Sequence, residues 1–598
     1  MTEVAETVPA GVVADGPGRR PRDRPADLAA VGSYVLGALF ITIRLFAHLG
    51  RRLPVSAGDR IQSEYFLSFA ARVLTHGVNP FYTGQMNAPF GVNTMANTSI
   101  LGLGIPMAPV TLLFGASTSF DLLIVIGIAG TATAWYWLLS RHLVHSRSAA
   151  WVGGLLGGFA PSVVSHAAYH PNLVAQFLVP LIAWRALRLV EPGRWLRNGL
   201  ALAGLVVYQV FINEEMLFLT ALAVAGFLIL YALQRRDQVR TAVKPLLAGL
   251  AVTAVVALAA LAYPLWEQFD GPGAYHGGDP FMTGFRMDVL GLTTFASNSI
   301  AARWDSFGPP PQPLGAEEHG YFGWPLVILL VTLVIWQWRT VLVRCAAVTA
   351  AVFAVLAWGS PLKLQDKNLD VPGPYAVLKH LPLFDTLLPT RLGEVTTWAL
   401  VPVVALGVQR LVDLPNLPGE TSHWRRRLLM IGAFAAALVP AAPLPITVID
   451  RQPVPAFITS GQWRSYVGPD QSVLVVPLPT WDTFAGLDWS AHTGLDLKLN
   501  HGYFLGPADG VKGDHAFSGP VRRPTDKLID AATYSGKTPT VTDADRVQAR
   551  VDLAYWHTAI ILCPDVPSAA YDRAVVEALI GPPRHVGGLW LWDVRTLE

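Results

Sequence analysis

A carboxylate at the start of an amphipathic segment is the most specific chemical signal in this chain. The segment 58–67 reads G-D-R-I-Q-S-E-Y-F-L, and Asp59 holds its second position, shortly after the first long apolar run. A carboxylate at the boundary between water and lipid is suited to act as a general base that deprotonates a hydroxyl group. The alternative is that Asp59 caps the N-terminus of a helix, a position in which Asp is common.

A second group of polar residues separates two apolar runs in the segment 212–216, I-N-E-E-M. We expect Asn213, Glu214 and Glu215 in a tight turn between two helices, where solubility does not require two adjacent carboxylates. We interpret them as acceptor-binding residues, or as a second acid that orients the nucleophile. The alternative is a short solvated hairpin whose carboxylates stabilise the N-terminus of the next helix.

His170 lies in a similar turn, S-H-A-A-Y-H-P-N at 165–172, one helical turn after His166. Two histidines at this spacing can hold a metal ion together with Glu214 or Glu215, but the spacing alone is weak evidence. A single His is more often an ordinary turn residue. We therefore predict no metal ion here and place His170 with the acceptor-binding group.

The elements that position these residues are predicted to be membrane helices. Hydrophobic residues make up 52% of the 598 residues, charged residues make up only 14%, and the mean hydropathy is +0.40. Ordinary soluble domains contain roughly 25% charged residues. No block of Lys and Arg alternates with aromatic residues, so we expect membrane lipids and no nucleic acid as partners.

Apolar runs of about 20 residues, long enough to cross a membrane, recur between residues 31 and 449. We predict eleven spans, near residues 32–50, 119–140, 148–169, 171–190, 196–212, 214–233, 243–266, 321–337, 341–358, 392–411 and 427–449. A further apolar stretch, 100–114, contains Pro106 and Pro109 and has no cation at its far end. We predict a re-entrant or surface helix for this stretch.

The distribution of Arg and Lys sets the predicted orientation, because cytoplasmic loops are enriched in both. With the stretch 100–114 excluded, every second loop is cationic, namely 141–147, 185–197, 235–244, 339–344 and 410–427. The N-terminus is then cytoplasmic and the C-terminus extracytoplasmic. The predicted external loops are 51–118, 267–320 and 359–391. Arg51 and Arg52 are the one exception to the charge rule.

Three domains follow from this pattern: a disordered cytosolic tail (1–30), a polytopic helical membrane domain (31–449) and an extracytoplasmic C-terminal domain (450–598). In the last of these, S-V-L-V-V-P-L-P at 472–479 and V-G-G-L-W-L-W-D-V at 586–594 are typical of strands. We predict a small α/β domain. Its aromatic and polar segments 481–484, 488–490 and 501–504 suit either a glycan-binding surface or core packing.

This architecture resembles the GT-C superfold of membrane glycosyltransferases. The matching features are an acidic residue just after the first span, a long helix-rich first external loop, a proline-broken stretch and an external C-terminal domain. Four shorter motifs are also similar: N-P-F-Y at 79–82, N-A-P-F-G-V-N at 87–93, H-G-Y-F-G-W at 319–324 and L-P-L-F-D-T-L-L-P-T-R at 381–391. The resemblance implies that a sugar is moved from a polyprenyl-phosphate donor to an acceptor outside the membrane, with Asp59 as the base.

The chain departs from the family's paired acidic motif, because Asp59 is followed by Arg60 and Ile61 and the next acid is Glu64. We therefore expect metal-independent transfer, with a divalent metal as the less favoured alternative. No other cofactor is expected.

Cationic side chains must then stabilise the leaving phosphate. We predict Arg391, at the outer end of the tenth span, with Arg60 and Arg52 beside the base. The alternative for Arg391 is an interfacial anchor, and that for Arg52 is a lipid-headgroup contact. Tyr65 and Asn87 complete the predicted acceptor-binding set, although external aromatic residues also suit membrane anchoring.

The leading hypothesis is an inverting hexosyl- or pentosyltransferase in a bacterial plasma membrane. It would build an extracytoplasmic glycan, glycolipid or glycoprotein of the cell envelope. A transporter or flippase of lipid-linked intermediates is the alternative, although no internal repeat of the kind common in transporters is visible. A non-catalytic partner in envelope assembly is a third interpretation. The sequence does not identify the sugar, the acceptor or the oligomeric state.

Overall fold

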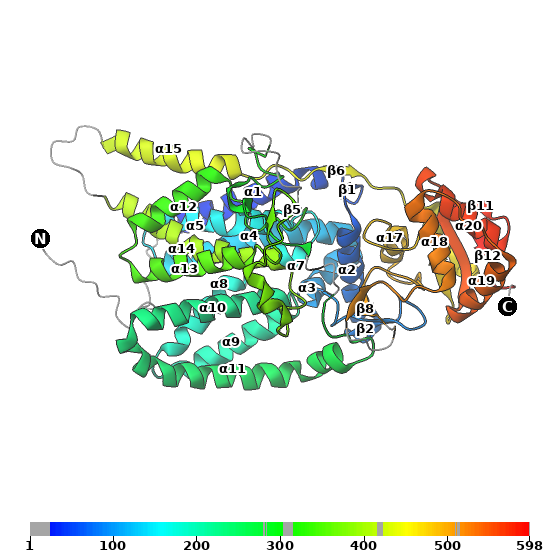
Figure 1. Cartoon of the computed structure of the whole chain (residues 1–598), viewed down its shortest axis with the longest axis horizontal. Helices are drawn as coiled ribbons and strands as arrows, with labels where there is room; N and C mark the ends of the chain where they lie inside the picture. The colour runs from blue at the N-terminus through cyan, green and yellow to red at the C-terminus, as the bar shows by residue number, and fades with distance from the viewer. Residues whose placement is uncertain are drawn as a thin grey trace, which may run out of the picture. The chain divides into compact units, whose positions relative to one another are not determined.

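The computed structural model describes residues 24–278, 282, 284–302, 315–414, 423–508, 510 and 515–596, and most of them are helical (Figure 1). The chain divides into two compact units. Unit 1 comprises Met1–Ile43, Leu123–Leu261 and Pro280–Ile446, and unit 2 comprises Arg44–Leu122, Ala262–Asp279 and Thr447–Glu598. Each unit is therefore assembled from three separate stretches of sequence.

The first helix, α1 (Arg24–Phe46), begins several residues before the predicted first span. Asp27 in its first turn accepts hydrogen bonds from Tyr136 and Arg141, both at 2.6 Å. These bonds explain why residues 24–30 are helical, whereas we predicted them as part of a disordered tail. The rest of that predicted tail, residues 1–23, lies outside the described residues.

Helices account for most of unit 1. They include most of α1, of α4 (Ala116–His142) and of α11 (Arg236–Asp270), whose remaining residues belong to unit 2. The other helices of unit 1 are α5 (Arg147–Phe159), α6 (Pro161–Val164), α7 (Pro171–Val174), α8 (Val179–Leu187), α9 (Trp195–Val210), α10 (Glu214–Gln234), α12 (Trp324–Trp336), α13 (Val341–Leu356), α14 (Gly393–Val412) and α15 (His423–Ala441). Short 3₁₀ turns include η2 (Arg188–Val190), η4 (Gly291–Thr293), η5 (Pro374–Ala376), η6 (Leu378–His380) and η7 (Pro389–Leu392), and β4 (Lys363–Leu364) pairs with β5 (Lys367–Asn368).

Five of the described helical segments are long and apolar enough to cross a membrane: α1, α4, α10, α11 and Pro389–Val412. The predicted spans 148–169 and 171–190 are broken into shorter helices instead. Pro161, Pro171 and Pro180 each stand in the first turn of one of these helices, because proline tolerates a first turn but interrupts a helix interior. The total number of spans stays a prediction.

Glycines on one side of α5 allow its neighbours to approach closely. A Cβ atom on Gly154 would lie 2.3 Å from the Tyr34 hydroxyl, and one on Gly158 would lie 2.6 Å from the Ala132 side chain. Small residues at such contacts are typical of helices that pack within membranes.

Unit 2 begins with β1 (Arg52–Pro54) and α2 (Gly58–His76), which packs against α3 (Leu101–Phe114). A helix over the stretch 100–114 is thereby confirmed. Three short antiparallel pairs accompany these helices: β1 with β6 (Val448–Asp450), β2 (Tyr82–Thr83) with β3 (Val92–Asn93), and β8 (Leu505–Pro507) with β9 (Ala516–Ser518). The pairing of β1 with β6 joins the first loop to the segment that follows α15.

A four-stranded sheet lies in the last part of unit 2, in the order β11 (Arg584–Val586), β12 (Leu589–Asp593), β10 (Thr558–Pro564) and β7 (Ser472–Val475). Only the β10–β7 pair is parallel. The other elements of this part are α16 (Ala456–Thr459), η8 (Gln462–Ser465), α17 (Ala485–His492), α18 (Pro524–Ser535), α19 (Asp543–Tyr555), η9 (Pro567–Ala569) and α20 (Ala570–Ile580).

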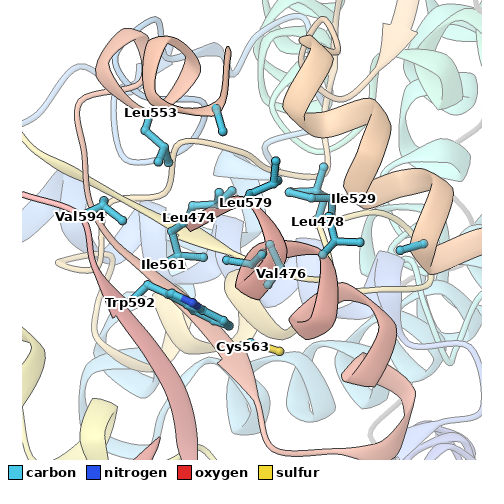
Figure 2. Packing of buried hydrophobic residues seen from close by; sticks show 14 of the residues in the cluster. Leu474, Val476, Leu478, Ile529, Leu553, Ile561, Cys563, Leu579, Trp592 and Val594 are labelled. Atoms are coloured by element: carbon cyan, nitrogen blue, oxygen red, sulfur yellow. The ribbon is translucent and has the colours of Figure 1, made fainter. Parts of the chain in front are cut away.

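Both faces of this sheet are buried. Leu474 and Ile561 pack on one face with Ile529 of α18, Leu553 of α19 and Leu579 of α20 (Figure 2). Neighbouring strand residues such as Val473 and Ile560 point to the opposite face and join a second apolar cluster. Strands buried on both faces read as continuous apolar runs, which explains the sequence S-V-L-V-V. The two strands expected from the sequence, near 472–479 and 586–594, are thus present.

Candidate functional site

A buried cluster of ionisable side chains lies in unit 1. His166 follows α6, His319 precedes α12 and Glu394 lies in the first turn of α14, and all three are fully buried. His319 Nε2 lies 3.2 Å from His166 Nε2, and His319 Nδ1 lies 3.0 Å from Glu394 Oε1. Each of the three offers a ligand atom within 4.8 Å of the other two, so together they have the donor set of a metal site.

Arg391 and Glu317 extend this cluster. Arg391 donates hydrogen bonds to Glu317 through Nε at 3.0 Å and Nη2 at 2.6 Å, and it also forms an ion pair with Glu215. Burial alone would raise the pKa of Glu317, but Arg391 and a 2.8 Å hydrogen bond with His319 lower it well below its usual range. Glu317 is therefore ionised at neutral pH.

His319 stands between two carboxylates. Burial lowers the pKa of its imidazole, whereas the hydrogen bonds to Glu317 and Glu394 raise that pKa to about 9. A proton can therefore occupy each ring nitrogen of His319 at neutral pH when no other cation is bound nearby. His319 is a central member of the cluster, because it contacts both carboxylates and His166.

Three of the residues predicted from sequence meet in this cluster. They are Arg391, Glu215 and His170, whose Nδ1 lies 3.1 Å from His166 Nδ1. Nε, Nη1 and Nη2 of Arg391 all bind carboxylates, so phosphate binding by Arg391 requires one of these partners to be displaced. The alternative prediction for Arg391 was an anchor at the membrane interface. Pairing with Glu317 and Glu215 differs from that role.

The two remaining polar residues of the 212–216 turn lie at the N-terminus of α10. Asn213 is buried, and its side-chain oxygen accepts a 3.0 Å hydrogen bond from the Met216 backbone N–H. It is therefore the N-cap of the helix. Glu214 is half-buried in the first turn, and its role in acceptor binding stays a prediction.

Asp59 lies in unit 2, in the first turn of α2, and is partly exposed. Asp59 does not occupy the N-cap position of the helix, because that position is held by Ala57. Instead Asp59 Oδ1 accepts a 2.8 Å hydrogen bond from the Tyr503 hydroxyl. Helix α2 can begin at this place because its first residue is Gly58. A Cβ atom at this position would lie 1.9 Å from the backbone oxygen of Trp481.

The surroundings of Arg60 are incompatible with its predicted role in phosphate binding. Its side chain is 0% exposed, and it forms 2.9 Å ion pairs with Glu64 and Asp121. The guanidinium also stacks on the Phe120 ring, 4.5 Å from its centroid. We correct the prediction accordingly: Arg60 has no surface to offer a phosphate and instead links α2 to the start of α4.

A second buried ion cluster continues from Glu64. Arg451 donates a 2.8 Å hydrogen bond to Glu64 Oε2 and forms an ion pair with Asp488. Burial alone would raise the pKa of Glu64, but Arg451 and Arg60 lower it. Burial raises the pKa of Asp488 despite the opposing effect of Arg451. Asp488 therefore belongs to a buried ion cluster, and the segment 488–490 is core rather than a glycan surface.

An open cavity of about 980 Å³ lies next to this cluster in unit 2. Its wall combines the cationic side chains of Arg51, Arg72 and Arg451 and the apolar side chains of Leu112, Phe114 and Val454 with the carboxylates of Glu64, Asp450 and Asp488. Glu64, Ser68 and Arg72 place one face of α2 along this wall. Such a lining suits an amphipathic anion, because arginine binds phosphate oxygens well and the apolar residues accept a hydrocarbon chain.

Arg52, Tyr65 and Asn87 have other contacts in unit 2. Arg52 is partly exposed and lies 3.1 Å from Asp450. Tyr65 is fully buried and packs edge-on against Phe66, so no face of its ring is accessible, and its role in acceptor binding stays a prediction. Asn87 donates a 2.9 Å hydrogen bond to the Gly91 carbonyl and so closes a turn.

Several residues of the two clusters were missed in the sequence, chiefly Glu394, Glu317, Arg451 and Tyr503. A signal for Glu394 was available, because an acidic residue inside an apolar run is costly and usually functional. The spacing of Arg60 and Glu64 also indicates an ion pair on one helix face. No local pattern indicated the contacts that Arg451 and Tyr503 make, because their partners are 387 and 444 residues away.

Comparison with known proteins places the chain among membrane proteins. A family model described as "Domain of unknown function (DUF6311)" matches residues 67–386. No curated protein matches the chain. Solved structures that match include the archaeal oligosaccharyltransferase AglB from Archaeoglobus fulgidus, in complex with an inhibitory peptide and a dolichol-phosphate, with 10% identity, a TM-score of 0.50, and coverage of 91% of this chain and 70% of that chain.

The apo form of the Archaeoglobus fulgidus oligosaccharyltransferase also matches, with 11% identity, a TM-score of 0.46, and coverage of 90% of this chain and 69% of that chain. The AglB likeness shows that the chain has the GT-C superfold. Together with the apolar helices, it identifies a multi-pass membrane protein. At this level of identity the likeness establishes the fold and leaves the activity to be argued from the site.

Proposed function

This chain belongs to the DUF6311 family, and we propose that it is an inverting glycosyltransferase that uses a polyprenyl-phosphate sugar as donor. The proposed acceptor is a hydroxyl group of an extracytoplasmic glycan, glycolipid or glycoprotein of the cell envelope. The proposed location is a bacterial plasma membrane, with a cytoplasmic N-terminus and an extracytoplasmic C-terminal domain. The GT-C fold supports this class of reaction, and the AglB structure was solved with a dolichol-phosphate.

The observation that carries the proposal is the cavity in unit 2. A polyprenyl phosphate has an anionic head and a long apolar chain, and the wall of the cavity offers arginines together with Leu112 and Phe114. Arg51 is exposed and is the cation we assign to the donor phosphate. We propose that the predicted partner Arg52, which also contacts Asp450, assists Arg51 at the same strand end.

Asp59 is the proposed general base. It stands on the same helix as Glu64, which lines the cavity, and five residues of helix correspond to about 7.5 Å of rise. In the proposed reaction its carboxylate takes the proton of the acceptor hydroxyl while the acceptor oxygen attacks the anomeric carbon. The bond from that carbon to the phosphate oxygen breaks, and the phosphate leaves with the electron pair.

The test is transfer of radiolabelled sugar from a panel of polyprenyl-phosphate donors by the full-length protein in lipid. We expect Asp59→Asn to bind donor normally and to lose at least 100-fold in turnover, as is typical when a general base is removed. Asp543→Asn is the matched control, because Asp543 is also in the first turn of a helix but is 97% exposed. Full turnover by Asp59→Asn would remove the base assignment.

A second arm of the assay tests the donor site. Arg51→Ala is expected to raise the KM for the donor about tenfold, equivalent to about 1.4 kcal/mol, with little change in kcat. If no donor in the panel is turned over, and membranes without the protein accumulate an untransported lipid-linked intermediate, the transporter alternative replaces the glycosyltransferase.

A further inference from the structure

We infer that His166, His319 and Glu394 form a binding site for a divalent transition-metal ion, with Zn²⁺ as the best match. This site lies in unit 1, and the inference is independent of the proposed glycosyl transfer. It replaces the sequence-based expectation of no metal ion, which considered His166 and His170 together with Glu214 or Glu215. His319 and Glu394 had not been considered as ligands.

The distance between the two imidazoles fits direct coordination, whereas Glu394 Oε1 is bonded to Nδ1 on the other side of the His319 ring and becomes a ligand only when this hydrogen bond is broken. The two imidazole Nε2 atoms are 3.2 Å apart, and ligand atoms of all three residues lie within 4.8 Å of one another. Zinc binds histidine nitrogens at about 2.0–2.1 Å in tetrahedral geometry, so two such nitrogens are about 3.3–3.4 Å apart. The observed separation is therefore close to one edge of a zinc tetrahedron.

The hydrogen bonds of the cluster are crowded without an ion. His319 Nε2 faces both His166 Nε2 and, at 2.8 Å, Glu317 Oε2. One N–H group can donate a well-aligned bond to only one of these two acceptors. A cation between the two imidazoles would be bound by both lone pairs and would remove this competition.

The charge of the cluster also favours a cation. Glu215 and Glu317 both pair with the guanidinium of Arg391, and Glu394 pairs with His319, so the cluster holds three carboxylates and one guanidinium. Buried charges are costly unless they are compensated. A divalent ion between the two imidazoles would place positive charge next to these carboxylates.

The surroundings orient the proposed ligands as expected for a metal site. Gln176 donates a 3.1 Å hydrogen bond to Glu394 Oε2 and accepts a 2.8 Å bond from the Trp398 indole N–H. His170 faces Nδ1 of His166, which leaves Nε2 of His166 directed at His319. Hydrogen bonds of this kind fix the orientation of metal ligands. Two nitrogen donors favour zinc over Mg²⁺ or Ca²⁺, which prefer oxygen.

Elemental analysis of the tag-free, full-length protein purified from zinc-supplemented cells tests the inference directly. We expect about one zinc ion per chain in the wild type and a loss of most of it in His166→Ala and Glu394→Gln. His501→Ala is the matched control, because His501 is another buried histidine with a carboxylate partner, Asp526 at 2.9 Å. This control should keep its metal.

Cobalt titration of the EDTA-treated wild-type protein covers the case in which a variant does not fold. Visible d–d absorption that saturates at about one Co²⁺ per chain supports a tetrahedral site. A metal-free wild type that also shows no such absorption would overturn the inference. It would indicate that a proton on His319 holds the cluster together. Equal metal content in the wild type and His166→Ala would likewise overturn it.

Discussion

Arg451 donates a 2.8 Å hydrogen bond to Glu64, although 387 residues separate them in the chain. The contact connects the segment after the last apolar helix to α2, which also carries Asp59. Glu64 is paired on its other oxygen with Arg60. The carboxylate of Glu64 therefore holds together two buried arginines that repel each other.

Replacing Glu64 with Gln should destabilise unit 2 by about 3–5 kcal/mol, the usual cost of removing one partner from a buried ion pair. The expected result is a lower thermal midpoint in detergent and faster hydrogen exchange in peptides from α2. Glu577→Gln, an exposed glutamate on α20, is the control and should change neither quantity. Unchanged hydrogen exchange in α2 would show that the ion pairs of Glu64 contribute little to the stability of unit 2.

The same carboxylate predicts an acid limit for stability. Because Arg451 and Arg60 lower the pKa of Glu64 below 4.5 in the folded protein, its ion pairs stabilise unit 2 at pH values above 4.5. That contribution is lost as the pH falls through the lowered pKa. The thermal midpoint of the wild type should therefore fall more steeply on acidification than that of Glu64→Gln. Parallel curves for the two proteins would contradict the prediction.

Tyr503→Phe tests the environment of the proposed base. The Tyr503 hydroxyl donates to Asp59, and a hydrogen bond to a carboxylate stabilises its charged form. Removing the hydroxyl should therefore raise the pH at which transfer falls to half on the acidic side. If Tyr503 had only a structural role, the variant would have a rate lowered equally at all pH values. The pH–rate profile therefore distinguishes a structural role from an effect on the charge of Asp59.

Gly58→Ala should displace the start of α2. The added Cβ would lie 1.9 Å from the Trp481 carbonyl oxygen, so the backbone must move and carry Asp59 with it. We expect at least a tenfold loss of transfer, because misplacement of a catalytic group by about 1 Å is costly. Gly84→Ala is the control, since nothing lies within 4 Å of the added atom. Equal activity of both variants would show that the position of Asp59 is not critical.

Composition and periodicity predicted the helical membrane character of the chain, because apolar length is a local property of the sequence. Strands β7 and β12 were also predictable, since all their residues except Ser472 and Asp593 are apolar. The prolines at 161, 171 and 180 were visible, yet their effect on the neighbouring spans was not anticipated. Each of them begins a new short helix rather than bending a continuous one.

The candidate sites were less predictable for a physical reason. Asp59, Glu215 and Arg391 were selected from short patterns, but each of them has a partner that is distant in sequence. Arg60 shows most clearly how a short pattern can suggest the wrong role. An arginine beside a candidate base resembles a phosphate ligand, and the burial that excludes this role depends on Asp121 and on Phe120.

The three-part composition of unit 2 has a consequence for biosynthesis. Residues 44–122 leave the ribosome long before Thr447, where the last stretch of the unit begins. At a rate of synthesis of about 5–20 residues/s, the interval between the synthesis of residue 122 and that of Arg451 is on the order of 15–65 s. During that interval Glu64 and Arg60 lack a completed core. A chain stalled between these points therefore holds a half-formed ion cluster in which Glu64 lacks its Arg451 partner.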